Sequence, residues 1–422
     1  MEYIKVQGNG PLHGTVHVEG AKNSALKLMA ASLMIEGVTH LCNVPDIADV
    51  HVMEELLCAL GVKITHPAEH ELLLDATTLV SHKAPYEVVA KMRASTAVLG
   101  PLTARLGKAA VALPGGCNIG SRKIDMHLSG LRDLGAEVGI EHGYIQVSTQ
   151  GDKLLGTEIS LDIPSVGATE NILMAAALAQ GTTIIDNAAR EPEISDLVDF
   201  LCEAGAHITG RGRSHIEIQG VEKLHPLTHR VVGDRIEAGT FVCAAVLAGG
   251  PLEVHGFDPE HLDIVLKKLV QAGATIERFE DGVRVDRTKP ILPVDIQTLP
   301  YPGFPTDMQA QFMALMAVAE GASMISENVF ENRFMFADEI GRMGADIRIE
   351  GHHAYVKGGA RLSGAPVKST DLRGGAALVL AGLIADGETI ISDIHHIDRG
   401  YENFCGKLQS VGAQVERVSI NA

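Results

Sequence analysis

Two hydrophobic patterns alternate along the chain. In the first, an amphipathic helix ends at a glycine and a strand follows, as in EELLCALGVKI and VDFLCEAGAHI. The pattern occurs six times, and its glycines recur about every 70 residues. Each glycine predicts a helix C-terminal cap with a positive φ angle, which a residue without Cβ adopts most easily. These glycines are Gly61, Gly135, Gly205, Gly273, Gly344 and Gly412.

The second pattern is an alanine- and leucine-rich helix, then a glycine, then a β-rich run, as in NILMAAALAQGTTIID. Such helices are apolar on nearly every side, which predicts that they are buried. The amphipathic helices, such as 53–60 and 265–272, are expected to lie outside.

Six units, each with two helices and several strands, are too long for ordinary solenoid repeats. We therefore predict an α/β fold of two globules with three units each, in which strands cover interior helices. A boundary candidate lies at 228–233, between units three and four. The strand expected at 3–6 precedes the first unit and could pair with the C-terminal half.

Composition narrows the function classes. The 422 residues are 46% hydrophobic and carry a net charge of −18, which argues against nucleic acid and anionic membranes as partners. The six cysteines are scattered without paired spacing, which fits a reducing cytoplasm and argues against a zinc site or a disulfide framework. The N-terminus lacks the features of a signal peptide, and the apolar segment 24–35 is too short to span a bilayer.

The segment 113–125, LPGGCNIGSRKID, is the densest in chain-breaking residues and holds one thiol, Cys117. Arg122 and Lys123 follow it, and a helix is expected directly afterwards. Cationic neighbours at a helix start lower the pKa of a thiol and can also hold an anion. The alternative is that Cys117 is an inert small hydrophobe among turn glycines.

Polar or charged residues open every alanine-rich helix. Lys22, followed by Asn23 or Ser24 as an N-cap, and Arg93 precede two of them, while Asp307 opens another. Helix N-termini bind anions, so we expect these polar ends to face one another across a cleft that takes an acidic substrate. The alternatives are an exposed lysine, a plain capping box at 164–171, and an aspartate that only complements the helix dipole.

Three other motifs give weaker evidence for a functional site. The segment 115–120 lacks the Lys-Ser/Thr of a phosphate-binding P-loop. The pairs His352-His353 and His395-His396 would point to opposite faces of a strand, which argues against metal binding. Arg399, just beyond the second pair, is a candidate clamp for a carboxylate or a phosphate.

Nine stretches in one order carry a resemblance that covers essentially the whole chain: GAKN, RAS, LPGGCNIGSRKID, PSVGATEN, DRIEAGTF, FPTDMQAQF, ENRFMF, DLRGGAALVLAGL and HIDRGYE. The chain resembles the UDP-N-acetylglucosamine 1-carboxyvinyltransferases, a bacterial family of the EPSP synthase-like superfamily. The resemblance implies a two-domain inside-out α/β barrel of six βαβαββ units, with the substrates between the domains. Domain I would be 22–232, with the catalytic loop 113–125, and domain II would be 1–21 plus 233–422.

The reaction implied by the resemblance transfers the enolpyruvyl group of phosphoenolpyruvate to the 3′-hydroxyl of UDP-N-acetylglucosamine and releases phosphate. It proceeds by addition and elimination through a tetrahedral intermediate, and it opens peptidoglycan synthesis for the cell wall in the cytoplasm. The resemblance implies no cofactor and no metal. It also implies inhibition by the epoxide antibiotic fosfomycin, through a covalent adduct on Cys117.

The resemblance also assigns roles to residues. Cys117 would be the general acid/base that protonates phosphoenolpyruvate, Asp307 would accept the proton of the sugar hydroxyl, and Lys22, Arg122 and Arg399 would hold phosphate and carboxylate. The residues implied in substrate binding are Lys22, Asn23, Arg93, Arg122, Lys123, Ile124, Asp125, Met126, His127, Ser165, Val166, Gly167, Asp307, the Val329 backbone, Asp371, Arg373 and Arg399.

Two departures from the family pattern, Phe336 and Lys123-Ile124, lie beside motif positions and concern affinity rather than the reaction. Two rival interpretations remain. The sister enzyme that makes 5-enolpyruvylshikimate 3-phosphate shares the reaction type, but its Gly-Ser-Lys-Ser and Gly-Asn-Ala-Gly-Thr hallmarks are missing here. A non-catalytic repeat scaffold would leave Cys117, Asp307, Lys22 and Arg399 together unexplained.

Overall fold

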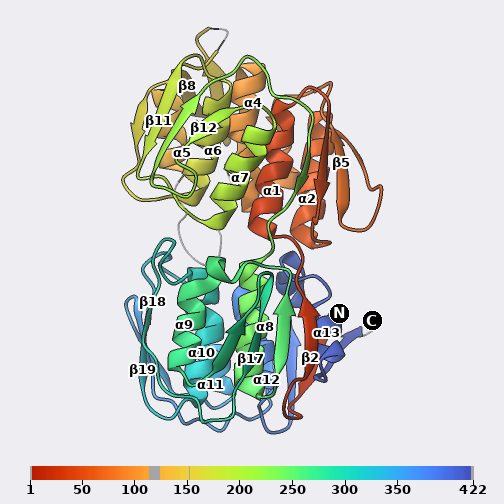
Figure 1. Cartoon of the computed structure of the whole chain (residues 1–422), viewed down its shortest axis with the longest axis vertical. Helices are drawn as coiled ribbons and strands as arrows, with labels where there is room; N and C mark the ends of the chain where they lie inside the picture. The colour runs from red at the N-terminus through yellow and green to blue at the C-terminus, as the bar shows by residue number, and fades with distance from the viewer. Residues whose placement is uncertain (1, 114–123, 152, 420–422) are drawn as a thin grey trace. The chain divides into compact units, whose positions relative to one another are not determined.

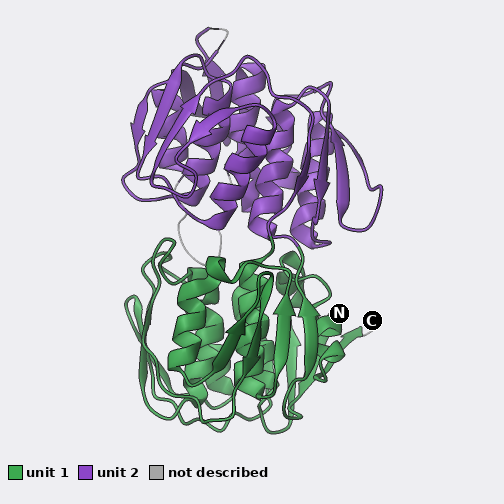
Figure 2. Cartoon of the chain, in the orientation of Figure 1, with its two compact units in different colours: residues 1–19, 118–121, 233–422 green, residues 20–117, 122–232 purple. Residues whose placement is uncertain are grey.

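The computed structural model describes residues 2–113, 124–151 and 153–419. These residues form two compact units, one built from 2–19 and 233–419 and the other from 20–113 and 124–232 (Figure 2). The chain therefore begins in unit 1, builds unit 2, and returns to unit 1. The segment 228–232, which precedes the return, is called the crossover segment below.

Within the described part of the chain, the strands form six four-stranded sheets, three in each unit. In unit 2 the sheets, in spatial order, are β14 (Thr228–Arg230), β3 (Val38–Cys42), β5 (Glu71–Asp75) and β4 (Lys63–Thr65); β6 (Lys83–Ala84), β7 (Lys108–Ala112), β9 (Tyr144–Thr149) and β8 (Ala136–Glu141); and β10 (Glu158–Ser160), β11 (Thr182–Asp186), β13 (His215–Gln219) and β12 (His207–Thr209).

The sheets of unit 1 follow the same order. They are β2 (Gly14–His17), β15 (Leu252–His255), β17 (Gly282–Asp286) and β16 (Thr275–Arg278); β18 (Ile296–Gln297), β19 (Ser323–Ser326), β21 (His353–Val356) and β20 (Ile347–Glu350); and β22 (Pro366–Lys368), β23 (Glu388–Ser392), β1 (Glu2–Gln7) and β24 (Gln414–Ser419). In every sheet the first pair is parallel and the other two pairs are antiparallel. This is the predicted βαβαββ unit repeated six times.

Helices fill the interior of each unit and the sheets lie around them (Figure 1). Unit 2 holds α1 (Lys22–Ala31), η1 (Ser32–Met34), α2 (Ala48–Leu60), α3 (Tyr86–Val89), η2 (Arg93–Val98), α4 (Leu99–Leu106), α5 (Asp125–Asp133), α6 (Val166–Ala177) and α7 (Pro192–Glu203). Unit 1 holds α8 (Arg235–Ala248), η3 (Pro259–Leu262), α9 (Asp263–Gln271), η4 (Thr306–Met308), α10 (Gln309–Val318), α11 (Ala337–Arg342), α12 (Leu372–Gly382), η5 (Ile394–Arg399) and α13 (Phe404–Ser410).

The burial of these helices follows the sequence patterns. The alanine-rich helices α6, α8, α10 and α12 are buried along nearly their whole length, as predicted. The amphipathic helices α2 and α9 expose one face. All six marker glycines have positive φ angles, between 89° at Gly135 and 110° at Gly61, which confirms the predicted helix ends. None of the described helices is long and apolar enough to cross a membrane.

The first and last described strands, β1 and β24, pair in one sheet, which confirms the expectation that the N-terminal strand pairs with the C-terminal half. β1 pairs antiparallel with β23 and with β24, so it takes the third position of the last sheet. Ile4 and Val6 are buried by this pairing. Burial of such side chains contributes about 1.5–3 kcal/mol each, so the first residues of the chain stabilise its last unit.

The crossover segment is anchored in unit 2 by polar contacts. Its strand β14 adds a parallel edge to β3, and the Val232 N–H donates to the Asp196 carboxylate at 3.2 Å. The buried imidazole of His229 bridges Asp196 and Glu203, at 3.0 and 2.7 Å. Ser24 of α1 donates to the same Asp196, so α1, α7 and the crossover segment are held together.

Candidate active site

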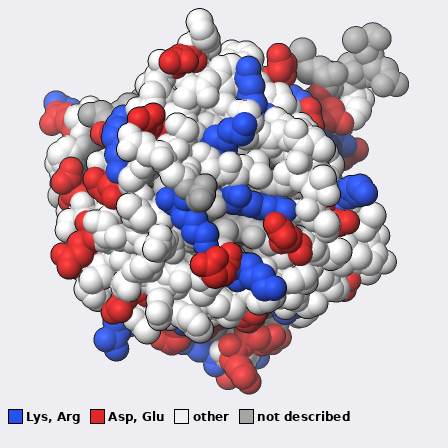
Figure 3. All heavy atoms as spheres, turned by 90° about the horizontal axis from the view of Figure 1, so that it is seen from above, with Lys and Arg blue, Asp and Glu red and all other residues white. Residues whose placement is uncertain are grey.

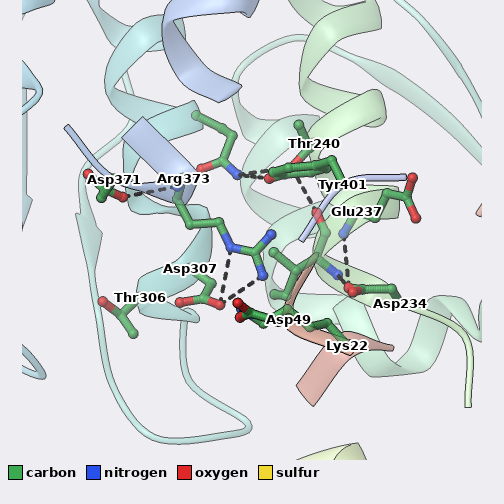
Figure 4. A network of polar contacts seen from close by, with 12 residues as sticks. Lys22, Asp49, Asp234, Glu237, Thr240, Thr306, Asp307, Asp371, Arg373 and Tyr401 are labelled. Carbon is green, nitrogen blue, oxygen red and sulfur yellow. Dashed lines mark hydrogen bonds and ion pairs between the residues drawn. The ribbon is translucent and has the colours of Figure 1, made fainter. Parts of the chain in front are cut away.

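The centre of the polar cluster in unit 1 is Asp307, in η4 directly before the buried helix α10. Arg333 Nη2 donates to Asp307 Oδ1 at 2.7 Å. Arg373 Nε and Nη2 donate to Asp307 Oδ2 at 3.3 and 3.1 Å (Figure 4). The two arginine side chains are only 5% and 3% exposed, but Asp307 is 24% exposed. Two buried cations therefore fix a carboxylate that remains accessible.

Arg373 is itself fixed at the start of α12. The carboxylate of Asp371 caps this helix and accepts from the backbone N–H groups of Arg373 and Gly374, at 2.9 and 3.0 Å. The guanidinium stacks over the ring of Tyr401, 5.2 Å from its centroid. Burial works against the charged form, but neighbouring oxygens, including those of Tyr401 and Asp307, more than offset it and raise the pKa of Arg373. The guanidinium therefore stays charged.

The buried carboxylate of Glu327 organises the other side of Asp307. It accepts from the hydroxyls of Thr298 and Thr306, at 2.9 and 2.8 Å, and from the N–H of Val329 at 2.9 Å. Thr306 also accepts from Arg333 Nη1 at 2.9 Å. Because the N–H of Val329 is engaged by Glu327, the backbone group that Val329 can offer a ligand is its carbonyl.

The polar cluster in unit 2 joins three helices through Asn171 of α6. Its Oδ1 accepts from the Gly100 N–H at 2.8 Å, and its Nδ2 donates to the Thr96 carbonyl at 3.2 Å and to His127 Nδ1 at 2.9 Å. Since Nδ1 accepts, the proton of the neutral imidazole is on Nε2, which is then a donor. A Cβ on Gly167 would lie 2.8 Å from His127 Cε1, so only glycine fits against this ring.

Burial, with smaller contributions from the cations of Lys27 and Arg93, lowers the pKa of His127 to about 4. The imidazole is therefore neutral at physiological pH, and its Nε2–H can offer a hydrogen bond rather than a positive charge. Lys27 forms an ion pair with Glu170 at 2.7 Å, and burial raises the pKa of Glu170.

Lys22 opens α1, and its ammonium lies 2.8 Å from the carboxylate of Asp49, in the first turn of α2. The residue before it, Ala21, is the N-cap, and no side chain caps this helix. The expectation that Asn23 or Ser24 caps α1 is therefore wrong, because both lie inside the helix and the Ser24 hydroxyl is used by Asp196. At α6 the capping alternative is observed in part: Ser165 is the N-cap, and its Oγ accepts from the Ala168 N–H at 3.4 Å.

Comparison with known proteins decides the family. The model of the EPSP synthase (3-phosphoshikimate 1-carboxyvinyltransferase) family matches residues 6–408. The chain belongs to the EPSP synthase family. Its relatives include UDP-N-acetylglucosamine 1-carboxyvinyltransferases from Desulfosudis oleivorans, 53% identical over 99% of this chain and 100% of that one, and from Corynebacterium jeikeium, 52% identical over 98% of both. This member of the EPSP synthase family is thus a carboxyvinyltransferase.

Solved structures of the EPSP synthase family agree with the fold. The enolpyruvyl transferase NikO from Streptomyces tendae has a TM-score of 0.90 at 27% identity and covers 100% of this chain and 99% of its own. EPSP synthase from Acinetobacter baumannii has a TM-score of 0.78 at 19% identity over 99% of this chain and 100% of its own, which shows the fold alone. The predicted fold class is confirmed.

The structure brings several residues implied by the family resemblance together within each unit. In unit 1, Asp307, Arg373 and Asp371 form one network, and Arg399 closes η5 beside His396. In unit 2, the His127 ring packs against Gly167, while Ile124 is at the N-cap position of α5, which Asp125 and Met126 begin. Cys117, Arg122 and Lys123 lie outside the described residues.

Sequence reasoning missed several residues that organise these clusters. Asn171, Glu170 and Arg333 were within the quoted stretches PSVGATEN and ENRFMF but received no role, and Asp49 and Glu327 were not singled out. Helical spacing gave a partial signal for Asn171, since it lies on the same helix as Gly167, four residues away. The argument that adjacent histidines point to opposite faces is wrong: the ring centroids are 3.9 Å apart in His352-His353 and 4.1 Å apart in His395-His396, which lies in η5 rather than in a strand.

The surface charge does not exclude an acidic substrate. Figure 3 shows one face on which basic and acidic side chains are interspersed, despite the net charge of −18. Cations fixed by ion pairs, such as Arg373 with Asp307 and Lys22 with Asp49, can act locally on an anion whatever the net charge. The chemistry supported by these clusters is proton acceptance by a fixed carboxylate and electrostatic stabilisation by fixed cations.

Proposed function

We propose that the protein transfers the enolpyruvyl group of phosphoenolpyruvate to the 3′-hydroxyl of UDP-N-acetylglucosamine and releases phosphate. The observation that carries this proposal is the identity of more than half of all residues, over the full length, to UDP-N-acetylglucosamine 1-carboxyvinyltransferases. The geometry around Asp307 supplies the chemical argument.

Asp307 accepts the proton of the sugar hydroxyl in this proposal. A carboxylate between two guanidinium groups is a weak base, and it would not deprotonate an alcohol in advance. The hydroxyl becomes strongly acidic only as its oxygen bonds to C2 of phosphoenolpyruvate, so a weak but well-placed acceptor is sufficient. Arg333 and Arg373 supply the placement, and the 24% exposure of Asp307 leaves the carboxylate within reach of substrate.

Cys117 delivers a proton to the methylene carbon of phosphoenolpyruvate as the sugar oxygen attacks C2, which gives the tetrahedral intermediate. Elimination then breaks the bond from C2 to the phosphate oxygen, and the Cys117 thiolate takes back a proton from the new methyl group. Lys22, Arg122 and Arg399 hold the phosphate and carboxylate of phosphoenolpyruvate and balance their charge. The ion pair with Asp49 fixes the position of the Lys22 ammonium.

The nucleotide sugar is bound by a larger set of residues. His127 offers Nε2–H as a neutral donor, and the N-terminal turn of α6 offers backbone amides to a phosphate. The residues proposed for this role are Asn23, Arg93, Arg122 to Met126, His127, Ser165, Val166, Gly167, Asp307 and the Val329 backbone, with Asp371 and Arg373 in support.

The proposed reaction places the enzyme in the cytoplasm, at the first committed step of peptidoglycan synthesis. Fosfomycin would inhibit it, because the Cys117 thiolate opens the epoxide: a C–S bond forms and the ring C–O bond breaks. The domains proposed from the resemblance, 22–232 and 1–21 plus 233–422, both contribute residues to the reaction.

The test is the rate of phosphate release from phosphoenolpyruvate with each of two acceptors, UDP-N-acetylglucosamine and shikimate 3-phosphate. We expect release with the nucleotide sugar, and release at least tenfold slower when Asp307 is replaced in Asp307→Asn. Release with shikimate 3-phosphate alone would overturn the proposal in favour of the sister activity.

A further inference from the structure

Three side chains with metal-binding atoms meet on the outer face of the sheet β14-β3-β5-β4 in unit 2. His40 and Cys42 are two residues apart on β3, so both point to the same face. Glu71 on β5 is the cross-strand partner of Cys42. All three side chains are partly exposed, and none belongs to the reaction proposed above.

The donor atoms of these residues converge on one point. His40 Nε2 lies 2.9 Å from a Glu71 carboxylate oxygen and 3.6 Å from Cys42 Sγ, and the three donor atoms all lie within 4.8 Å of one another. Zinc bonds of about 2.3 Å to sulfur and about 2.0 Å to nitrogen, at the tetrahedral angle, require about 3.6 Å between the two atoms. The observed sulfur–nitrogen distance fits directly. The carboxylate oxygen must move away by about 0.4 Å, which rotation of the glutamate side chain allows.

The alternative, a nucleophilic Cys-His-Glu triad, does not fit. A triad uses the two ring nitrogens separately, one for the nucleophile and the other for the carboxylate. Here the same atom, His40 Nε2, faces both the thiol and the carboxylate.

We propose that His40, Cys42 and Glu71 bind a divalent transition-metal ion of the zinc type at the surface of unit 2. Thiolate, imidazole and carboxylate together are a ligand set that zinc and cobalt prefer, and water would complete the tetrahedron. Arg230, the residue of β14 paired with Cys42, carries a positive charge that would repel a bound metal ion. The Arg230 side chain is exposed and can turn toward solvent.

The metal would act on the crossover segment. The carbonyl of Cys42 accepts from the Val231 N–H at 3.0 Å, and the next residue, Asn43, donates its amide to the Val231 carbonyl at 2.9 Å. An ion that joins β3 to β5 at Cys42 therefore stiffens the strand on which the crossover segment is docked. We expect bound metal to raise the thermal midpoint of the whole chain, because it binds the folded state alone.

The experiment is a titration of the chelator-treated full-length protein with Co²⁺, followed by the thiolate-to-cobalt charge-transfer band in the near ultraviolet. We expect one equivalent of Co²⁺ to produce the band, which excess Zn²⁺ removes. Cys42→Ser should abolish the band and Glu71→Gln should weaken Co²⁺ binding at least tenfold. Two matched controls, Cys58→Ser at an exposed cysteine and Cys117→Ala in the catalytic loop, should retain it.

The readout does not depend on activity, so it is independent of the proposed function. A band that survives in Cys42→Ser, or that is lost in Cys117→Ala, would assign the thiol elsewhere and overturn the proposal. Absence of any band from the wild-type protein at millimolar Co²⁺ would overturn it as well. If Cys42→Ser fails to fold, retention of full Co²⁺ affinity in Glu71→Gln would contradict the proposed site.

Discussion

Arg373 donates through both Nε and Nη2 to a single oxygen of Asp307, across 66 positions of sequence. The arginine is fixed at its backbone by Asp371 and at its guanidinium by the ring of Tyr401. The carboxylate is thus oriented by a side chain that has almost no freedom to move. The first prediction follows from this rigidity.

Arg373→Lys should lower kcat by roughly 10–100-fold and change KM for UDP-N-acetylglucosamine much less. A lysine keeps the positive charge but loses the two guanidinium N–H donors that orient the Asp307 carboxylate. Loss of a charge-assisted hydrogen bond costs about 1.5–3 kcal/mol, which corresponds to the expected fall in kcat. Steady-state kinetics measures both constants, and Arg342→Lys on the exposed side of α11 is the control. A rise in KM with unchanged kcat would show that Arg373 serves substrate binding alone.

Gly167→Ala should lower the thermal midpoint and raise KM for UDP-N-acetylglucosamine. The added Cβ would meet the His127 ring at 2.8 Å, and such overpacking costs about 1–3 kcal/mol. Gly341→Ala is the matched control, because Gly341 is also helical and a Cβ there has nothing within 4 Å. Alanine should stabilise that position by up to about 1 kcal/mol. Equal effects of the two substitutions would contradict the packing of Gly167 against His127.

His127 should make the protein less stable in acid. Its pKa is about 4 in the folded state and 6.5 ordinarily, so between these values the unfolded chain binds more protons than the native protein. The contribution is complete above pH 6.5 and is lost as pH falls toward 4, a change of roughly 3 kcal/mol.

The comparison that isolates this effect is wild type against His127→Gln, in urea unfolding at a series of pH values. The difference in unfolding free energy should shrink as pH falls from about 7 to about 4. Glu237, whose pKa burial raises to about 7, changes stability in the opposite direction but is present in both proteins and cancels. A difference that is constant with pH would show that His127 is protonated normally.

Fosfomycin should add to one cysteine, Cys117. Burial raises the pKa of the five other cysteines, Cys42, Cys58, Cys202, Cys243 and Cys405, so they are protonated at neutral pH. Mass spectrometry of the intact protein should show one adduct, which Cys117→Ala loses and Cys58→Ser keeps. An adduct that persists in Cys117→Ala would remove the basis for the assigned role.

Much of the fold could be predicted from the sequence because the repeat has local markers. Helix-terminating glycines such as Gly61 and Gly412 require a backbone conformation that other residues adopt poorly, so the positions are visible in the sequence. Helices that are apolar on every side, such as α10, are predicted to be buried from their sequence alone. The pairing of β1 with the C-terminal half could be expected because its strand precedes the first unit, but no sequence pattern marks β23 and β24 as its partners.

The contacts of the candidate active site could not be predicted in the same way, because they join residues that are far apart in sequence. Asn171 and His127 are 44 positions apart, and Arg333 and Asp307 are 26 apart, so no local pattern records their hydrogen bonds. The same is true of His40, Cys42 and Glu71: cysteine spacing argued against a zinc site, and the third donor comes from the neighbouring strand. The predicted N-cap of α1 was wrong because Ser24 lies inside the helix and its hydroxyl donates to a distant partner, Asp196.

The most direct test of the central claim is the product itself. The enzyme is incubated with phosphoenolpyruvate and equimolar UDP-N-acetylglucosamine and shikimate 3-phosphate, and both acceptors are analysed by mass spectrometry. We expect only UDP-N-acetylglucosamine to gain an enolpyruvyl group, with one phosphate released per product. An enolpyruvyl group on shikimate 3-phosphate, or on neither acceptor, would contradict it.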